Sequence, residues 1–377
     1  MRGMKREEPN IVLIVCDDLC LGDLSCYGNP YVRTPNLDRL YAESVRLARY
    51  CSGPLCSPAR ASLMTGKYHY RTRVVDTYLG RSMMDPGVAT LAEMLKERGY
   101  ATGIFGKWHL GDCYPMRPQD KGFDEALVHR GGGIGQPGDW PGNGYFDPVL
   151  SDNGTPRRFA GYCADIFTGG AIEFIRRHAG REPFFALLAT NTPHSPFEVD
   201  EKWTAGFADK GLPDKFAKIY GMVANIDWNV GRVLEALRLA GAEENTIVIF
   251  TSDHGPCMSA LADGRSRFNC GLRGIKGQMY EGGIRVPHLW RWPGRLPAGK
   301  DVDAPAHPID VVPTLLAAAG TEAPEDVDGI NLLPLMAGEA GRQAPASAAD
   351  RLLFMQWHRG DVPVLFGTCA VIAGNWK

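Results

Sequence analysis

The chain has 377 residues and a formal net charge of −2, so its composition indicates neither nucleic acid nor an anionic membrane as a partner. Hydrophobic residues make up 44% of the chain, which is typical of a globular core. The apolar run at residues 11–16 is too short to cross a membrane, and no signal peptide is recognisable. As written, the sequence predicts a cytoplasmic protein, or a periplasmic or secreted one if a leader has been removed.

Cysteines are numerous but form no recognisable metal or redox motif. No two of the ten cysteines stand in a C-x-x-C pair, which argues against a zinc ribbon or a redox dithiol. Five of them fall in the first sixth of the chain, at spacings that fit no standard zinc site: Cys16, Cys20, Cys26, Cys51 and Cys56. Many unpaired cysteines are typical of a reducing compartment.

Acidic side chains follow two of the predicted strands. Residues 11–16 and 246–252 are continuous apolar, β-branched runs, typical of strands buried on both faces of a parallel sheet. Because the carboxyl ends of parallel strands meet at one edge, and buried carboxylates need a counter-charge, we expect a hard-metal site there. For the first pair alone, a helix N-cap with a solvated turn is an equal alternative. The two runs end in these residues: Asp17 and Asp18, then Asp253 and His254.

Two other predicted strands lead into basic side chains. Residues 100–106 form a strand that runs into Lys107 and His109, which stand two apart and therefore face the same way in an extended chain. Residues 184–189 form a buried strand, and in the following loop His194 is flanked by prolines that stiffen the backbone. A cation and an imidazole aimed together suit a site that cleaves an anion, although the K-x-H spacing alone is weak evidence.

Helices are predicted between these strands from apolar residues at helical spacing. One begins at Thr34 and another at Cys56, and three more span residues 90–98, 162–177 and 218–239. A helix that begins at Cys56 presents free backbone N–H groups and its positive dipole end there, which suits an anionic group.

Residues 56–60 read C-S-P-A-R and are followed by A-S-L-M-T-G. This run resembles the C-x-P-x-R signature of the type I, formylglycine-dependent sulfatases, which belong to the alkaline-phosphatase-like superfamily. Further blocks resemble the same family from about residue 10 to residue 335: T-P-N-L-D-R-L, G-K-W-H-L-G, P-H-S-P, D-H-G and G-I-K-G-Q-M-Y-E-G-G. The resemblance implies an α/β fold, with a large central, mostly parallel β-sheet flanked by helices on both faces.

The resemblance also implies an active site. In the family, a formylglycine-generating enzyme oxidises the signature cysteine to an aldehyde, whose hydrate is the nucleophile; here that residue is Cys56. The implied cofactor is one divalent cation, calcium, with magnesium or manganese as alternatives. His254 is a less usual ligand for a hard cation, because calcium prefers oxygen. The implied catalytic residues are Cys56, Arg60, Lys107, His109, His194 and Lys276, and the implied metal ligands are Asp17, Asp18, Asp253 and His254.

The expected chemistry is that of a sulfuric ester hydrolase, an arylsulfatase-like enzyme. Lys107, Lys276 and His194 would hold the sulfate oxygens, and either His194 or Lys276 would protonate the leaving alcohol. His109 would take the proton from the second hydroxyl of the hydrated aldehyde. Two alternatives stay open: a phosphate or phosphonate ester hydrolase of the same superfamily, and a binding protein that keeps the fold without catalysis. The intact cysteine, lysine and histidine blocks argue against the second alternative.

A small sulfated carbohydrate is the expected substrate. The glycine-rich segment 130–148 offers Trp140 and Tyr145 for stacking on a sugar ring, although a surface loop packed on itself is an equal alternative. A second loop offers charge for a carboxylate or a further sulfate. Its cationic residues are Arg265, Arg267 and Arg273.

Two parts of the chain are predicted. Residues 1–340 form the catalytic domain, and residues 341–377 form a linker and the start of a small C-terminal subdomain that looks truncated relative to the family. Residues 352–356 and 367–373 are its predicted strands.

Overall fold

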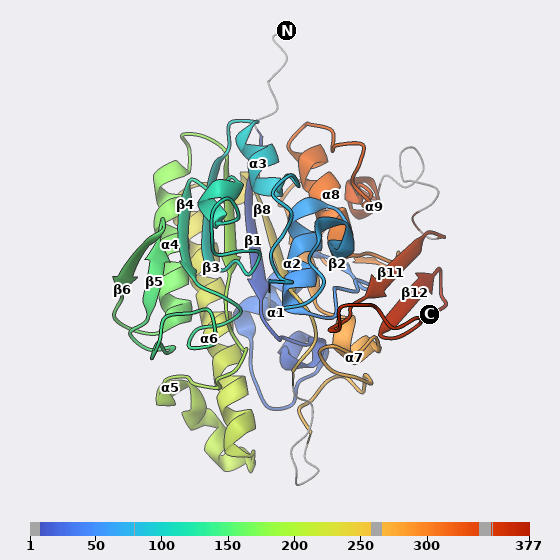
Figure 1. The fold of residues 1–377 in the computed structure, drawn as a ribbon. Helices are drawn as coiled ribbons and strands as arrows, with labels where there is room; N and C mark the ends of the chain where they lie inside the picture. The colour runs from blue at the N-terminus through green and yellow to red at the C-terminus, as the bar shows by residue number, and fades with distance from the viewer. Residues whose placement is uncertain (1–7, 79, 258–265, 339–347, 349) are drawn as a thin grey trace.

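A computed structural model describes residues 8–78, 80–257, 266–338, 348 and 350–377. Within these residues one large sheet of ten strands runs through the middle of the molecule (Figure 1). The strand order is β10-β2-β9-β8-β1-β7-β3-β4-β5-β6.

The five central strands are parallel, and on both sides the next strand joins them antiparallel. The central strands are β8 (Thr246–Ser252), β1 (Asn10–Cys16), β7 (Phe184–Ala189), β3 (Ala101–Lys107) and β4 (Glu125–His129). β9 (His288–Arg291) runs antiparallel to β8 and to β2 (Val45–Leu47), which carries the edge strand β10 (Asp301–Val302). At the other edge, β5 (Val149–Asp152) and β6 (Thr155–Arg158) continue antiparallel from β4.

The register of the central strands decides where the functional residues lie. Cys16, the last residue of β1, is opposite Ser252, the last residue of β8. The acidic residues that follow these two strands therefore leave the sheet at the same edge, as the sequence predicts. Lys107, the last residue of β3, reaches that edge two strands away from β1.

Helices cover both faces of the sheet, which confirms the predicted fold class (Figure 1). Val12 and Ile14 of β1 share one core with α1 (Pro35–Glu43), α4 (Cys163–His178) and α6 (Asp214–Leu239). Ile11, Leu13 and Val15 point to the other face. That face is covered by α2 (Cys56–Thr65), α3 (Leu91–Lys96), α8 (Val311–Ala318) and α9 (Leu333–Ala337). Two short helices, α5 (Glu201–Thr204) and α7 (Glu281–Ile284), lie outside these layers.

The predicted helices are present, with small differences at their ends. The helix predicted from residue 218 begins four residues earlier, at Asp214, directly after Pro213, because proline is well suited to the start of a helix. Within the predicted span 90–98 the regular helix ends at Lys96, and the Thr90 side chain accepts a hydrogen bond from the backbone of Glu93. None of the helices in the described residues is long and apolar enough to cross a bilayer.

A small antiparallel sheet lies at the C-terminal side, next to α7 (Figure 1). Its strands are β11 (Leu352–Gln356) and β12 (Cys369–Ala373), close to the two predicted there. Arg351 anchors this sheet to Asp310 of the main domain, with Nη1 2.7 Å from Oδ1. The predicted boundary near residue 340 lies outside the described residues.

Candidate active site

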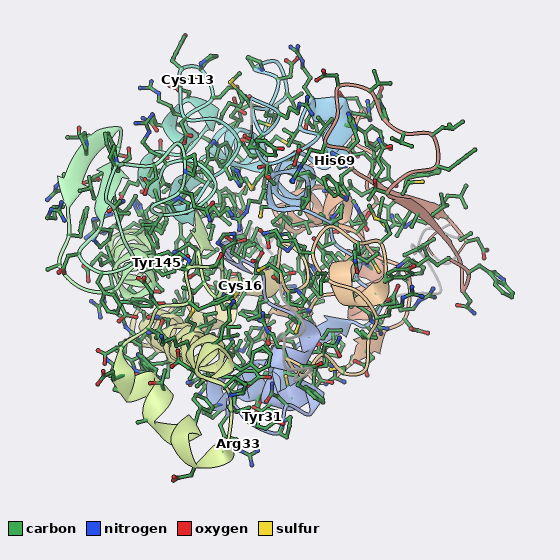
Figure 2. The ribbon with its side chains drawn as sticks, turned by 60° about the horizontal axis from the view of Figure 1, so that its bottom comes forward. Cys16, Tyr31, Arg33, His69, Cys113 and Tyr145 are labelled. Atoms are coloured by element: carbon green, nitrogen blue, oxygen red, sulfur yellow. The ribbon has the colours of Figure 1, made fainter. Side chains whose placement is uncertain are left out.

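The ends of β1 and β8 bring four possible metal ligands together. One ligand atom from each of Asp17, Asp18, Cys56 and His254 lies within 4.8 Å of the other three, and all four residues are buried. Asp253 adjoins this group, with Oδ1 3.4 Å from His254 Nε2 and 3.3 Å from the backbone nitrogen of Asp18. This group lies at one corner of the sheet, where β1 and β8 end. Figure 2 shows Cys16, the last residue of β1, near the middle of the molecule, with Tyr145 on one side and His69 on the other.

His254 is held so that one nitrogen faces the cluster. Its Nδ1 lies 2.8 Å from the carbonyl oxygen of Gly255, to which it donates, and its Nε2 lies 3.4 Å from Asp18 Oδ1. Burial alone would lower the pKa of His254, but Asp253 and Cys56 raise it to about 9. Without a cation, Nε2 therefore carries a proton at neutral pH, and a bound cation would take the place of that proton.

Cys56 is the first residue of α2, so its side chain lies at the positive end of a helix dipole. The Sγ atom is 3.1 Å from His254 Nε2 and 3.6 Å from Asp17 Oδ1. Burial on its own would raise the pKa of the thiol, but the ammonium groups of Lys107 and Lys276 hold that pKa well below its ordinary value. An electropositive setting of this kind favours an anion at the position of Cys56.

Arg60, one turn further along α2, ties two strand ends together. Its Nε and Nη2 lie 3.1 Å and 2.9 Å from Asp253 Oδ2, and its Nη1 donates to the carbonyl oxygen of Lys107 at 3.0 Å. Because Arg60 is only 4% exposed, these contacts hold the ends of β8 and β3 in place.

The two predicted lysines each pair with a different carboxylate of the cluster. Lys107 Nζ is 2.7 Å from Asp17 Oδ2 and fully buried. Lys276 Nζ is 2.7 Å from Asp18 Oδ1, and its side chain is 18% exposed. Lys107 is therefore at the floor of the site, and Lys276 is on its open side. Three carboxylates and three cationic side chains thus cancel in charge across Asp17, Asp18, Asp253, Arg60, Lys107 and Lys276.

His109 follows β3 in a left-handed backbone conformation, with φ of +58°. Its Nε2 lies 2.9 Å from the carbonyl oxygen of Thr77, while its buried Nδ1 has no hydrogen-bond partner in the described part of the chain. Burial and then the charge of Lys107 lower the pKa of His109, although the neighbouring Cys56 opposes this. The imidazole is therefore neutral at pH 7, with Nδ1 free to accept a proton.

The glycine-rich segment lies against His109. A Cβ atom at Gly132 would meet His109 Cε1 and Nε2 at 2.9 Å, so only glycine allows this close approach. Trp140 of the same segment is half-buried, and the guanidinium of Arg130 lies 4.9 Å from the centre of its indole ring.

His194 lies in the loop after β7, with Nε2 3.9 Å from Asp18 Oδ2 and its side chain 10% exposed. The Tyr145 side chain holds the backbone of this loop in place. Its hydroxyl is 3.0 Å from the carbonyl oxygen of His194 and 3.1 Å from that of Ser195. Because Tyr145 is fully buried, the prediction that it stacks on a sugar is wrong.

The prediction that the loop with Arg265, Arg267 and Arg273 binds a charged group of the substrate is corrected in the same way. Arg267 is 2% exposed and pairs with buried Asp23, with Nε 2.7 Å from Oδ1, so it is not free to bind a substrate. Arg273 is exposed and lies over the ring of Tyr280 at 3.9 Å. Arg265 lies outside the described residues.

All ten predicted site residues thus converge on one corner of the sheet. The sequence prediction missed the groups that support them: Tyr145 under His194, Thr77 beside His109, and Arg267 with Asp23 beside Asp18. Arg267 Nη2 also donates to the backbone oxygen of Asp18 at 3.3 Å. All ten cysteines are unpaired, and Cys56 alone among them lies in this cluster of possible ligands, within the described residues.

The chain matches the sulfatase family over residues 9–321. It belongs to that family. This sulfatase is 34% identical to mouse (Mus musculus) steryl-sulfatase, over 95% of the chain and 70% of that protein. It is 35% identical to human (Homo sapiens) N-acetylgalactosamine-6-sulfatase, over 94% of the chain and 69% of that protein. Like its relatives, it is a sulfuric ester hydrolase.

Solved structures agree with this assignment. Ps i-CgsB in complex with k-i-k-neocarrahexaose superposes on this sulfatase with a TM-score of 0.82 and 30% identity, covering 94% of this chain and 80% of the other. The phosphonate monoester hydrolase of Agrobacterium radiobacter has the same fold, with a TM-score of 0.68 and 24% identity, covering 94% of this chain and 81% of the other. Sulfate ester hydrolysis is thus favoured over the two alternatives left open by the sequence.

Proposed function

We propose that this sulfatase hydrolyses a sulfate ester on a carbohydrate, using a matured Cys56 and one calcium ion. The observation that carries the proposal is the setting of Cys56: Sγ lies 3.1 Å from His254 Nε2 and 3.6 Å from Asp17 Oδ1, at a helix N-terminus flanked by two lysines. A formylglycine-generating enzyme would be the partner in maturation.

The residues at this corner fit a divalent cation. Among the residues that the structure describes, the buried Asp18 Oδ2 has no hydrogen-bond partner, so it is an acceptor that a cation would satisfy. Oxygen donors suit calcium, and one imidazole nitrogen suits magnesium or manganese less well than it suits softer metals. The proposed ligands are Asp17, Asp18, Asp253 and His254. When bound, the cation would neutralise charge on the ester and lower the pKa of a hydroxyl group beside it.

The charge of the site supports an anionic substrate. Three carboxylates already balance three cationic side chains, so a bound divalent cation leaves the site positive. Lys107 and Lys276, which pair with Asp17 and Asp18, would then be able to hold sulfate oxygens. His194 or Lys276 would donate a proton to the leaving alcohol, because both lie on the more exposed side of the site.

His109 is proposed as the base that takes a proton at residue 56. Maturation of Cys56 would supply an aldehyde whose hydrate carries two hydroxyls, one to attack sulfur and one to lose a proton later. The Nδ1 atom of His109 is the free, unprotonated nitrogen that would accept that proton, since Nε2 donates to the carbonyl oxygen of Thr77. Arg60 would keep Asp253 and the end of β3 in place without touching substrate.

A carbohydrate substrate is supported by the names of two relatives. One hydrolyses N-acetylgalactosamine-6-sulfate by name, and another was solved with a bound neocarrahexaose, at 35% and 30% identity. Trp140 and Arg273 are the aromatic and cationic groups that remain available after Tyr145 and Arg267 are excluded.

We propose residues 1–340 as the catalytic domain and residues 341–377 as part of a C-terminal subdomain.

The test is a substrate panel with matured enzyme. The protein is co-expressed with a formylglycine-generating enzyme, mass spectrometry of the Cys56 peptide measures maturation, and calcium is supplied. We expect turnover of sulfated mono- or disaccharides, weaker turnover of a phenyl phosphonate, and none with Cys56→Ala. Trp140→Ala and Arg273→Ala should lower kcat/KM for sugars more than for a small aryl sulfate.

Two outcomes would contradict the proposal in different ways. Sulfatase activity that survives in Cys56→Ala would remove the proposed nucleophile. Good turnover of aryl sulfates, with no sugar sulfate cleaved and neither loop variant affected, would leave a sulfatase but overturn the carbohydrate assignment.

A further inference from the structure

We propose that Asp76 and Arg359 are positioning residues for His109, through which the C-terminal sheet controls the proton transfer at residue 56. The inference rests on the proposed function, because it assigns a role to groups that support the proposed base. Neither residue touches Cys56 or the proposed metal ligands in any contact found in the described residues.

The first step concerns which nitrogen of His109 carries the proton. The two nitrogens of a neutral imidazole are distinct, and the partner of one decides the state of the other. Here Nε2 faces the Thr77 carbonyl oxygen at 2.9 Å, so it is protonated and Nδ1 is left as the acceptor. A displaced Thr77 carbonyl would leave both tautomers open and the ring free to rotate.

The second step concerns what holds Thr77, the residue whose carbonyl oxygen faces His109. The backbone nitrogen of Thr77 donates to Asp76 Oδ1 at 2.8 Å, which fixes the peptide that enters Thr77. Asp76 is 1% exposed, and a buried carboxylate without a cation would be costly. Arg359 meets that need, with Nε 3.1 Å from Oδ2 and Nη2 3.3 Å from Oδ1.

The third step concerns what holds Arg359. It follows β11, and its guanidinium lies 4.8 Å from the ring centre of Tyr78 and 5.3 Å from that of Trp357. Trp357 Nε1 donates to the carbonyl oxygen of Gly277 at 2.8 Å, one residue after Lys276. The segment after β11 is thus joined both to the support of His109 and to the loop that carries Lys276.

A positioning role predicts more than a loss of stability. If Arg359 only held the C-terminal sheet, any loosening of that sheet would reduce activity equally. Arg49 offers a matched control, because its side chain bonds the same sheet at Asn375, with Nη1 2.9 Å from Oδ1, and has no contact with Asp76 among the described residues. Arg359→Lys keeps one positive charge beside Asp76 and is the conservative variant.

The experiment compares Arg359→Met, Asp76→Asn, Arg359→Lys and Arg49→Met with the wild type, all matured and calcium-loaded, on an aryl sulfate. We expect kcat to fall roughly 10- to 100-fold in the first two variants and KM to fall with it, so that kcat/KM changes little, because the slowed step follows release of the alcohol. Alcohol release should then show a rapid first turnover of one equivalent per site, since His109 acts after the alcohol has left. Arg359→Lys should recover part of kcat, and Arg49→Met should retain it.

A second readout does not depend on turnover. ¹⁵N NMR of histidine-labelled protein, with His109→Gln for assignment, should report the Nε2–H tautomer in the wild type and a mixture in Arg359→Met. An unchanged tautomer and kcat, a rise in KM alone, or an equal loss in Arg49→Met would each overturn the inference. An inactive wild type with the expected tautomer change would overturn the proposed function, and with it the catalytic meaning of the positioning, while the physical link to His109 would stand.

Discussion

Two residues of the site, Asp18 and His109, follow buried strands in left-handed backbone conformations, with φ of +67° and +58°. For a non-glycine residue such a conformation costs roughly 1–2 kcal/mol, so the surroundings must impose it. Asp18 is held by the Asp253 carboxylate at its backbone nitrogen and by Lys276 at its side chain. This backbone conformation at Asp18 turns the chain sharply, so that Asp17 and Asp18 can both face the space between the strand ends.

At the scale of single residues, we predict that calcium stabilises the protein by binding Asp18. A ligand present at about 100 times its Kd adds about 2.7 kcal/mol to the free energy of unfolding, so calcium should raise the Tm of the wild type. Asp18→Asn removes the charge but tolerates a positive φ, and it should abolish this calcium-dependent shift. Differential scanning calorimetry with and without EDTA measures it. Asp152→Asn, at an exposed ion pair of β5, is the control and should respond to calcium as the wild type does.

At the scale of elements, α2 and the C-terminal sheet decide how the site is held. All ten residues of α2 are buried, so the helix that presents Cys56 is fixed along its whole length. The C-terminal sheet is covered on one face only: Leu352 and Phe354 of β11 are exposed, whereas Leu353 and Met355 are buried in a small apolar cluster with residues of the main domain. Its attachment therefore combines this small apolar cluster with polar contacts, among them the Arg351–Asp310 ion pair, at 10% and 2% side-chain exposure.

We predict that Arg351→Met loosens the C-terminal sheet alone. Removing one partner of a buried ion pair costs about 3 kcal/mol, because the other charge is left unpaired. Hydrogen exchange should show this loss of protection in β11 and β12 and no change in β1, because local openings differ between parts of a structure. Arg157→Met, at an exposed pair of β6, should change neither. Equal loss of protection in β1 would mean that the sheet unfolds only with the whole molecule.

At the scale of the whole molecule, buried histidines link folding to pH. His288, at the start of β9, is 1% exposed, and its ring stacks on Tyr50 with 3.7 Å between the ring centres. Neither of its ring nitrogens has a hydrogen-bond partner among the described residues. Burial lowers its pKa to about 3. The unfolded chain binds this proton below about pH 6.5, whereas the folded protein does not until about pH 3. The free energy of unfolding must therefore fall as the pH is lowered between those values.

We predict that His288→Phe reduces this acid sensitivity. One such histidine accounts for about 2 kcal/mol of stability lost between pH 7 and pH 5, and phenylalanine keeps the ring on Tyr50 without a titratable group. Urea unfolding at the two pH values, in calcium-saturated buffer, gives the difference for each protein. The difference should be smaller in the variant by about this amount. Equal differences in the two proteins would contradict the lowered pKa of His288.

The sequence by itself determined the strands β1, β7 and β8, because continuous apolar runs of that length are stable only when buried in a sheet. It also indicated which residues gather at the sheet edge, because Asp17, Asp18 and Asp253 directly follow strands and Cys56 begins a helix. Arg60 and Lys276 were predicted from the resemblance of their motifs to the family. Only the tertiary structure decided which side chains serve as supports. Arg267 and Asp23 are 244 positions apart, and Arg359 and Asp76 are 283 apart. No local pattern encodes such pairs, and a cation or an aromatic ring in a loop has the same sequence signature whether it faces substrate or, like Arg267 and Tyr145, is buried against its own chain.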